Sequence, residues 1–211
     1  TSDNAQRTYA KVMKFFVIAC CFMFLLIGLY LDVFKWIFTT FANPRWAEGL
    51  QIVPLLALGN IFLGIYYNLS VWYKLTNKNM YGAIITIIWA VITIVLNILL
   101  IPKLHYTGAA IATFSCYLFM MVSSYKLGQK YYPVPYPVKK LTAYMVLVIL
   151  IYLVHLGINK LYPDHLWFSL LTATFLFGCF TWFVGKIEAK ELAKLPVIGK
   201  YFKHKDKLNK G

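Results

Sequence analysis

Hydrophobic positions in this chain gather in six long stretches without a charged residue, separated by short polar connections. Each stretch is 17 to 24 residues long, the length an α-helix needs to cross a hydrocarbon core of ~30 Å. Membrane barrel strands are about ten residues long and alternate with period two, which these stretches do not. The pattern predicts an all-α integral membrane protein with six transmembrane helices, over about 15–34, 50–73, 80–101, 106–126, 141–159 and 166–185.

The connections between the stretches are short and rich in residues that form turns. They contain Asn43-Pro44, Asn77-Lys78-Asn79, Pro102-Lys103, Pro133 to Pro137, and Pro163-Asp164. We therefore expect one helical bundle over residues 1–185, followed by a basic cytoplasmic tail over residues 186–211.

The basic residues predict the orientation of these helices. The segment before the first stretch and those after the second, fourth and sixth contain 17 of the 21 Lys and Arg residues. Lys and Arg are enriched in cytoplasmic connections. Both termini are therefore expected on the cytoplasmic side.

The composition agrees with a membrane protein and narrows the alternatives. Residues are 61% hydrophobic and 13% charged, whereas soluble domains carry about 25% charged residues. The net charge of +14 does not indicate nucleic-acid binding, because the cations lie between the apolar stretches and form no basic stripe along a helix. The four cysteines lie inside apolar stretches, two of them adjacent, and predict neither a disulfide framework nor a zinc site.

Signatures of enzymes are missing from the sequence. It contains no phosphate-binding glycine loop, no His-Glu-x-x-His motif and no nucleophile elbow. No acidic residue lies well inside an apolar stretch, where proton and sodium relays usually place one. His155 is the one titratable residue well inside, and a hydrogen-bonded or interfacial role is favoured over a proton shuttle. We predict no catalytic residue, no metal site and no cofactor.

The second stretch has the most polar interior. Asn60, Gly64 and Asn68 follow one another at four-residue intervals, and Tyr67 lies beside that face. Amides facing lipid would lack hydrogen-bond partners, so this face is expected to point into the bundle or a water-filled cavity. It is interpreted either as a polar wall for a sugar or lipid head group, or as a site of interhelical hydrogen bonds, worth ~0.6 kcal/mol each.

The third stretch repeats this pattern more weakly. Thr86, Thr93 and Asn97 share one helix face. Because threonine hydroxyls can bond to their own helix, packing is favoured for this face. Asn97 is the fourth candidate for lining a substrate cavity, together with Asn60, Tyr67 and Asn68.

Two further features concern packing. Gly108, Ala112 and Cys116 repeat every four residues in the fourth stretch, a spacing that lets two helices approach closely. This face is predicted to be a packing seam. Pro54 lies one turn inside the second stretch and predicts a bend there.

Several segments resemble the bacterial polysaccharide flippases, the O-antigen and capsule transporters of the multidrug/oligosaccharidyl-lipid/polysaccharide exporter superfamily. They are Leu63–Lys74 with Thr76 and Tyr81-Gly82-Ala83, Asn97–Lys103, Gly108–Thr113 and Gly128–Pro133. The family usually has a glycine in the turn where this chain has Leu104-His105-Tyr106. The resemblance covers about residues 10–140 well and the last two stretches only in pattern.

The resemblance implies a fourteen-helix transporter of which this chain would be the last six helices. The chain begins with Thr1 and not with Met, and we expect it to be part of a longer protein. The implied activity is export of surface polysaccharide precursors by alternating access, with a polyprenyl-linked oligosaccharide as substrate. The implied location is the bacterial cytoplasmic (inner) membrane, with membrane lipids and other polysaccharide-assembly proteins as further partners.

Other functions stay open at this point. A multidrug or cation exporter of the same superfamily would be expected to carry acids inside its helices. A membrane-embedded glycosyl- or acyltransferase would need clustered acids or histidines at the mouth of a loop. A non-catalytic scaffold for polysaccharide assembly would need none of these features.

Overall fold

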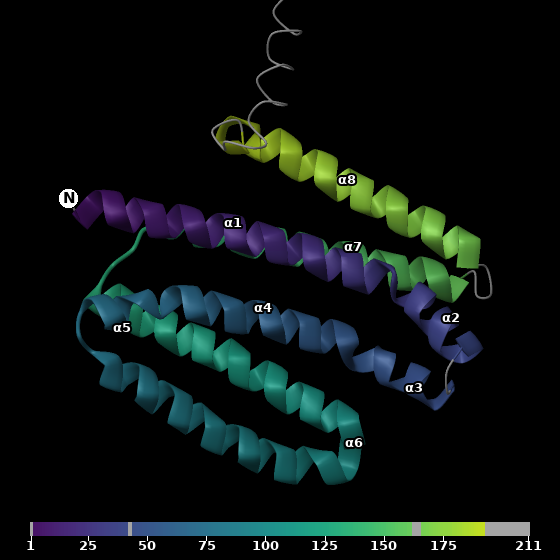
Figure 1. The fold of residues 1–211 in the computed structure, drawn as a ribbon, viewed down its shortest axis with the longest axis horizontal. Coiled ribbons are helices and arrows are strands. Elements are labelled where there is room, and N and C mark those ends of the chain that lie inside the picture. The colour runs from purple at the N-terminus through teal and green to yellow at the C-terminus, as the bar shows by residue number, and fades with distance from the viewer. Residues whose placement is uncertain (1, 42–43, 162–165, 193–211) are drawn as a thin grey trace, which may run out of the picture. The chain divides into compact units, whose positions relative to one another are not determined.

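The computed structural model describes residues 2–41, 44–161 and 166–192 (Figure 1). These residues are almost entirely helical (94%) and include no strand, which confirms the all-α prediction. Five of the described helical segments are long and apolar enough to cross a membrane. Residues 193–211 of the predicted tail and the connection at 162–165 lie outside the described residues.

The chain divides into two compact units, with the boundary after Leu153. The first unit extends from the N-terminus into the middle of α7 (Val138–Leu161). The second begins at Val154 and contains the end of α7 together with α8 (Leu166–Leu192).

The first predicted span is divided between two helices. α1 extends over Ser2–Leu29 and is followed, after a turn at Tyr30, by α2 (Leu31–Phe41). α1 thus ends before the predicted boundary at residue 34, and Asp32 lies in the first turn of α2, where an acidic side chain stabilises the start of a helix.

The second predicted span is built from several elements. α3 (Pro44–Gly49) and a short 3₁₀ helix, η1 (Leu50–Ile52), lead into α4 (Val53–Leu69), which continues through Ser70 into α5 (Val71–Leu75). Pro54 stands in the first turn of α4. A proline fits there because the first N–H groups of a helix have no partner within it. Pro54 therefore begins α4 after the 3₁₀ turn and does not bend it from within.

The third and fourth predicted spans form one element, α6 (Asn79–Tyr131), so six separate spans are not confirmed. The element contains Pro102 and has non-helical angles at His105 (φ 49°, ψ −132°). There the chain folds back on itself (Figure 1). Trp89 of the first arm stacks on Phe119 of the second, with ring centroids 4.9 Å apart. α6 is therefore an antiparallel helical hairpin.

The predicted small-residue seam lies inside this hairpin. Gly108, Ala112 and Cys116 are all buried, and the Cys116 Sγ lies 3.7 Å from the Trp89 carbonyl oxygen. A Cβ atom at Gly108 would come within 2.6 Å of the Leu100 carbonyl oxygen. Only glycine lets the two arms approach this closely after the turn. The interpretation of this face as a packing seam is confirmed.

α4 is the central helix of the first unit, with its most extensive contacts to α6 and further contacts to α1. Phe62 of α4 packs against Phe114 of α6 at 5.5 Å between ring centroids. The hydroxyl groups of Tyr66 and Thr86 form a hydrogen bond of 3.2 Å between the same two elements. Phe16 of α1 lies directly on Gly64. These contacts hold one face of α4 in the interior.

In the second unit, polar side chains join α7 and α8. The Asn159 Nδ2 donates to the Ser169 Oγ at 3.1 Å and lies 3.1 Å from the His155 Nε2. The Thr172 Oγ1 lies 3.5 Å from the His155 Nδ1. His155 is 2% exposed. The prediction of a hydrogen-bonded histidine is confirmed.

Candidate functional site

The predicted polar face of α4 is partly open. Asn60 is exposed and Tyr67 is 62% exposed, and their separation of seven residues places them on one helix face. The Asn60 Nδ2 donates to the Leu56 carbonyl oxygen of its own helix at 3.0 Å. The amide oxygen of this exposed side chain has no hydrogen bond among the contacts described, so it can accept one from a ligand hydroxyl or water.

Asn68 differs from Asn60 in its surroundings. It is half-buried, and its Nδ2 donates to the Gly64 carbonyl oxygen at 3.0 Å. An eight-residue separation turns it about 80° from Asn60 at 3.6 residues per turn. Asn60 and Tyr67 therefore form the centre of the open stripe, and Asn68 lies at its edge. We call Asn60 and Tyr67 the α4 stripe.

Asn97 lies on another surface. It follows Trp89 and Thr93 at four-residue intervals, on the face of the first arm of α6 that packs against the second arm. Its Oδ1 is buried without a hydrogen-bond partner. Such an atom calls for an ordered water or a ligand. The Thr93 hydroxyl bonds to the Trp89 carbonyl oxygen, as expected for threonine in a helix. The four predicted residues are thus not gathered at one place.

A second polar region lies where α5 meets the two ends of α6. The ring of Tyr131 stacks on Trp72 at a centroid distance of 5.6 Å and contacts Tyr81 at 5.3 Å. The hydroxyl groups of Tyr81 and Tyr131 are 3.1 Å apart, and the Lys78 Nζ lies 3.7 Å from the centroid of the Tyr131 ring. We call Trp72, Lys78, Tyr81 and Tyr131 the aromatic cluster.

Local sequence explains how this cluster is positioned. Asn77 has a positive φ of 53°, a conformation that asparagine tolerates, and it turns the chain from α5 into α6. A Cβ atom at Gly128 would lie 2.9 Å from the Trp72 Cδ1, so glycine lets the indole rest against α6. The Trp72 Nε1 donates to the Ser124 Oγ at 3.3 Å. The indole is 3% exposed and fixed from two sides.

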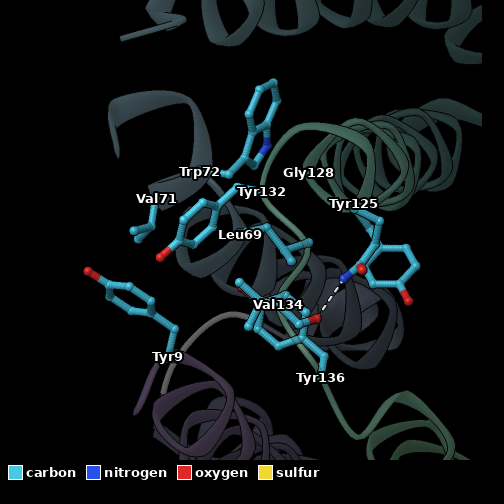
Figure 2. Close-up of a pocket in the computed structure, with 10 residues that line it drawn as sticks. Tyr9, Leu69, Val71, Trp72, Tyr125, Gly128, Tyr132, Val134 and Tyr136 are labelled. Atoms are coloured by element: carbon cyan, nitrogen blue, oxygen red, sulfur yellow. Dashed lines mark hydrogen bonds between the residues drawn. The ribbon is translucent and has the colours of Figure 1, made fainter. Parts of the chain in front are cut away.

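A small pocket opens beside the cluster, between α1, α5 and the connection after α6 (Figure 2). Its volume of ≈ 10 Å³ is enough for about one water molecule. The Gln129 Nε2 donates to the Val134 carbonyl oxygen at 2.8 Å and fixes the connection. Burial, together with the neighbouring Tyr132, Tyr125 and Tyr9, raises the pKa of the Tyr136 phenol to about 12.

Sequence reasoning did not select the aromatic cluster. Its signal was present, because Trp72 and Tyr81 stand at the ends of apolar stretches, Tyr131 lies in the connection after the fourth stretch, and lysines lie close to all three in the sequence. Amphipathic aromatic residues are enriched at such positions. The sequence also did not predict that two charged residues, Lys14 (4% exposed) and Glu188 (1% exposed), are buried. Each lies at the edge of an apolar stretch, where a charged side chain is expected to be exposed.

Comparisons of the chain with models of known families, with curated proteins and with solved structures found no match. Within the described residues, no group of three or more His, Cys, Asp or Glu side chains is placed to hold a metal ion. The structure has two surfaces that could bind polar ligands. The α4 stripe presents an amide and a phenol, and the aromatic cluster presents rings, hydroxyl groups and an ammonium group.

Proposed function

We propose that the chain crosses a bacterial cytoplasmic membrane six times, with both termini in the cytoplasm. A straight helix of 53 residues would be about 80 Å long, far more than a hydrocarbon core of ~30 Å. The turn at His105 gives two arms, each of a length suited to one crossing. The distribution of Lys and Arg supports the orientation.

We propose further that the protein is a transporter that flips a polyprenyl-linked oligosaccharide, as the polysaccharide flippases that it resembles do. The observation that supports this most is the α4 stripe. Asn60 and Tyr67 are exposed on a helix segment with a mean hydropathy of 1.7. Polar groups that face hydrocarbon are costly, whereas polar groups that line a water-filled path are usual in transporters.

The chemistry of the stripe suits a sugar. The amide oxygen of Asn60 can accept a hydrogen bond from a sugar hydroxyl, and the Tyr67 phenol can donate and accept. The Tyr67 ring also offers an apolar surface beside these groups. Each bond alone is weak, so a head group with many hydroxyls could bind and still leave when the protein reopens.

The deciding experiment removes the full-length gene from its host and measures lipid-linked oligosaccharides in each membrane leaflet. The proposal predicts that completed repeat units accumulate on the cytoplasmic side. Failure to complete the repeat units would favour a transferase or an assembly scaffold. Unchanged lipid-linked sugars with increased drug sensitivity would favour a multidrug exporter.

Complementation then tests the stripe itself. Asn60→Leu and Tyr67→Ala in the full-length protein are expected to lower export about tenfold when combined, which corresponds to ~1.4 kcal/mol. Thr181→Val is the matched control, because Thr181 is also exposed and also bonds only to its own helix among the contacts described, at Phe177. Equal export by all variants would contradict a role for the stripe.

A further inference from the structure

The aromatic cluster has features that packing alone does not require. The Lys78 Nζ lies 3.7 Å from the centroid of the Tyr131 ring and 6.0 Å from that of Tyr81. An ammonium this close to a ring face is attracted by the ring quadrupole and held in place. Because the ring contacts one side of the ammonium, its remaining N–H donors point away from the ring and stay available.

The hydroxyl pair adds a further donor. When the Tyr81 and Tyr131 hydroxyl groups share one hydrogen bond of 3.1 Å, one of the two hydroxyl protons is still free. The Lys130 Nζ approaches the same Tyr131 ring at 5.7 Å. Two ammonium groups and a hydroxyl proton thus surround one ring that the buried Trp72 holds rigid.

Many cations and few acids lie near this end of the first unit. The basic residues that flank Tyr9, the cluster and the connection after α6 are Arg7, Lys11, Lys74, Lys78, Lys126, Lys130, Lys139 and Lys140. Asp32 and Glu48 are the acids of this unit whose side chains the structure describes. Asp32 lies beyond the far end of α1, about 30 Å from Tyr9, and α4 separates Glu48 from Trp72 by about 25 Å.

We propose that the aromatic cluster binds the phosphate group of an anionic lipid at the membrane surface. The ammonium groups of Lys78 and Lys130 would neutralise the phosphate, and the free tyrosine hydroxyl would donate to one of its oxygens. With the helices crossing the membrane as proposed above, the rings would stand near the ends of the spans, where aromatic side chains meet lipid head groups. The inference stands on the contacts of the cluster and does not depend on the transport activity proposed above.

Two kinds of lipid carry a negatively charged phosphate group that the cluster could bind: a phospholipid with an anionic head group, and a polyprenyl diphosphate. The full-length protein in neutral detergent is titrated with short-chain phosphatidylglycerol, with farnesyl diphosphate, and with short-chain phosphatidylcholine as the zwitterionic reference. Binding is measured for the native protein, Lys78→Gln, Tyr131→Phe and the control Lys74→Gln. Lys74 is an exposed lysine in the last turn of α5, four residues before Lys78, and makes no described contact with a ring.

We expect Lys78→Gln to weaken binding of at least one anionic lipid about fivefold, the effect of one Lys at an anionic membrane surface. Tyr131→Phe keeps the ring that holds Lys78 and should weaken binding by a smaller factor, about twofold. Lys74→Gln should have less than half the effect of Lys78→Gln. If Lys78→Gln weakens the binding of farnesyl diphosphate alone, the ligand is a polyprenyl lipid. If it weakens the binding of both farnesyl diphosphate and phosphatidylglycerol, the cluster is a general phosphate site.

Equal effects of Lys78→Gln and Lys74→Gln would overturn the inference, since they would reflect net charge alone. Binding of phosphatidylcholine as tight as that of both anionic lipids would overturn it too. Thermal unfolding of each variant checks that the fold is kept. If a variant of the cluster loses binding of the anionic lipids but still exports normally, the lipid site exists and is not needed for transport. Absence of accumulated repeat units in the deletion strain would contradict transport and leave the lipid site standing.

Discussion

Two asparagines inside apolar helices are used in opposite ways. In the second unit, Asn159 of α7 donates to Ser169 of α8 and contacts His155, so polar groups satisfy one another between two helices. On α4, Asn60 bonds only to its own helix among the contacts described and is exposed. The first arrangement joins helices, whereas the second leaves a polar surface open. The residue type is the same and both helices are apolar, so the function of a polar residue in a membrane helix depends on what lies opposite it.

The closed network should give the largest change in stability. Asn159→Ala would leave the His155 Nε2 and the Ser169 Oγ without this partner in a buried place. We expect a loss of about 1–2 kcal/mol in the free energy of unfolding, measured by reversible denaturation of the full-length protein in mixed micelles. Thr181→Val should change it by less than ~0.5 kcal/mol. Similar values for both variants would mean that the network does not hold α7 and α8 together.

The turn of α6 should give a change of opposite sign. His105 adopts a positive φ of 49° with ψ of −132°, which is costly for a residue with a Cβ atom. His105→Gly should therefore stabilise the protein by about 1 kcal/mol, after allowance for the greater freedom of glycine in the unfolded chain. Leu104→Gly, in the adjacent helical position, should destabilise it by a similar amount. Destabilisation by both substitutions would exclude strain at His105.

The open stripe should tolerate a substitution that the closed network does not. Asn60→Leu removes an amide whose N–H bonds only within its own helix, so we expect a stability change below ~0.5 kcal/mol together with the loss of export described above. The same denaturation measurement checks this. A loss as large as that of Asn159→Ala would show that Asn60 is also a joining residue, and the contrast between the two asparagines would fail.

Tyr136 provides an effect that is confined to alkaline pH, in a connection outside the helices. Its pKa of about 12 exceeds the ordinary value of ~10 for tyrosine. The folded state thus favours the neutral phenol, so this contribution to stability is complete below pH 10 and is lost as the pH rises towards 12. Tyr136→Phe should reduce the fall in stability between pH 10 and 12, whereas the exposed Tyr106→Phe should not. An unchanged alkaline slope in Tyr136→Phe would contradict a buried phenol.

Much of the fold follows from hydropathy, since charge-free stretches of this length have few structures open to them. The small face of Gly108, Ala112 and Cys116 predicted the seam of α6 because its four-residue spacing needs only local geometry. The limit of α1 at Leu29 and the 3₁₀ start of α4 were not predictable, because turn chemistry and helix pattern compete at those points.

The sites were harder to predict than the fold. Spacing placed Asn60, Tyr67 and Asn68 near one another, but it could not say which amide would be exposed and which half-buried. Asn97 shares the residue type and lies inside the α6 hairpin, a contact between arms that no periodicity in one arm reveals. The aromatic cluster brings together residues 50 positions apart in sequence, Tyr81 and Tyr131. Which residues form such a site depends on tertiary contacts, which the sequence pattern of one helix does not reveal.

Transport by the proposed route requires the α4 stripe to face water inside the membrane. Cysteine accessibility tests it most directly, in a full-length protein whose Cys20, Cys21, Cys116 and Cys179 have been replaced by alanine. Asn60→Cys and Tyr67→Cys are treated in intact membranes with a charged, water-soluble thiol reagent, beside Ile88→Cys, an exposed apolar position on α6. We expect the two stripe positions to react at least about tenfold faster than Ile88→Cys, because a thiol reacts as thiolate and needs water. Equal, slow reaction at all three positions would place the stripe against lipid or protein and contradict the account.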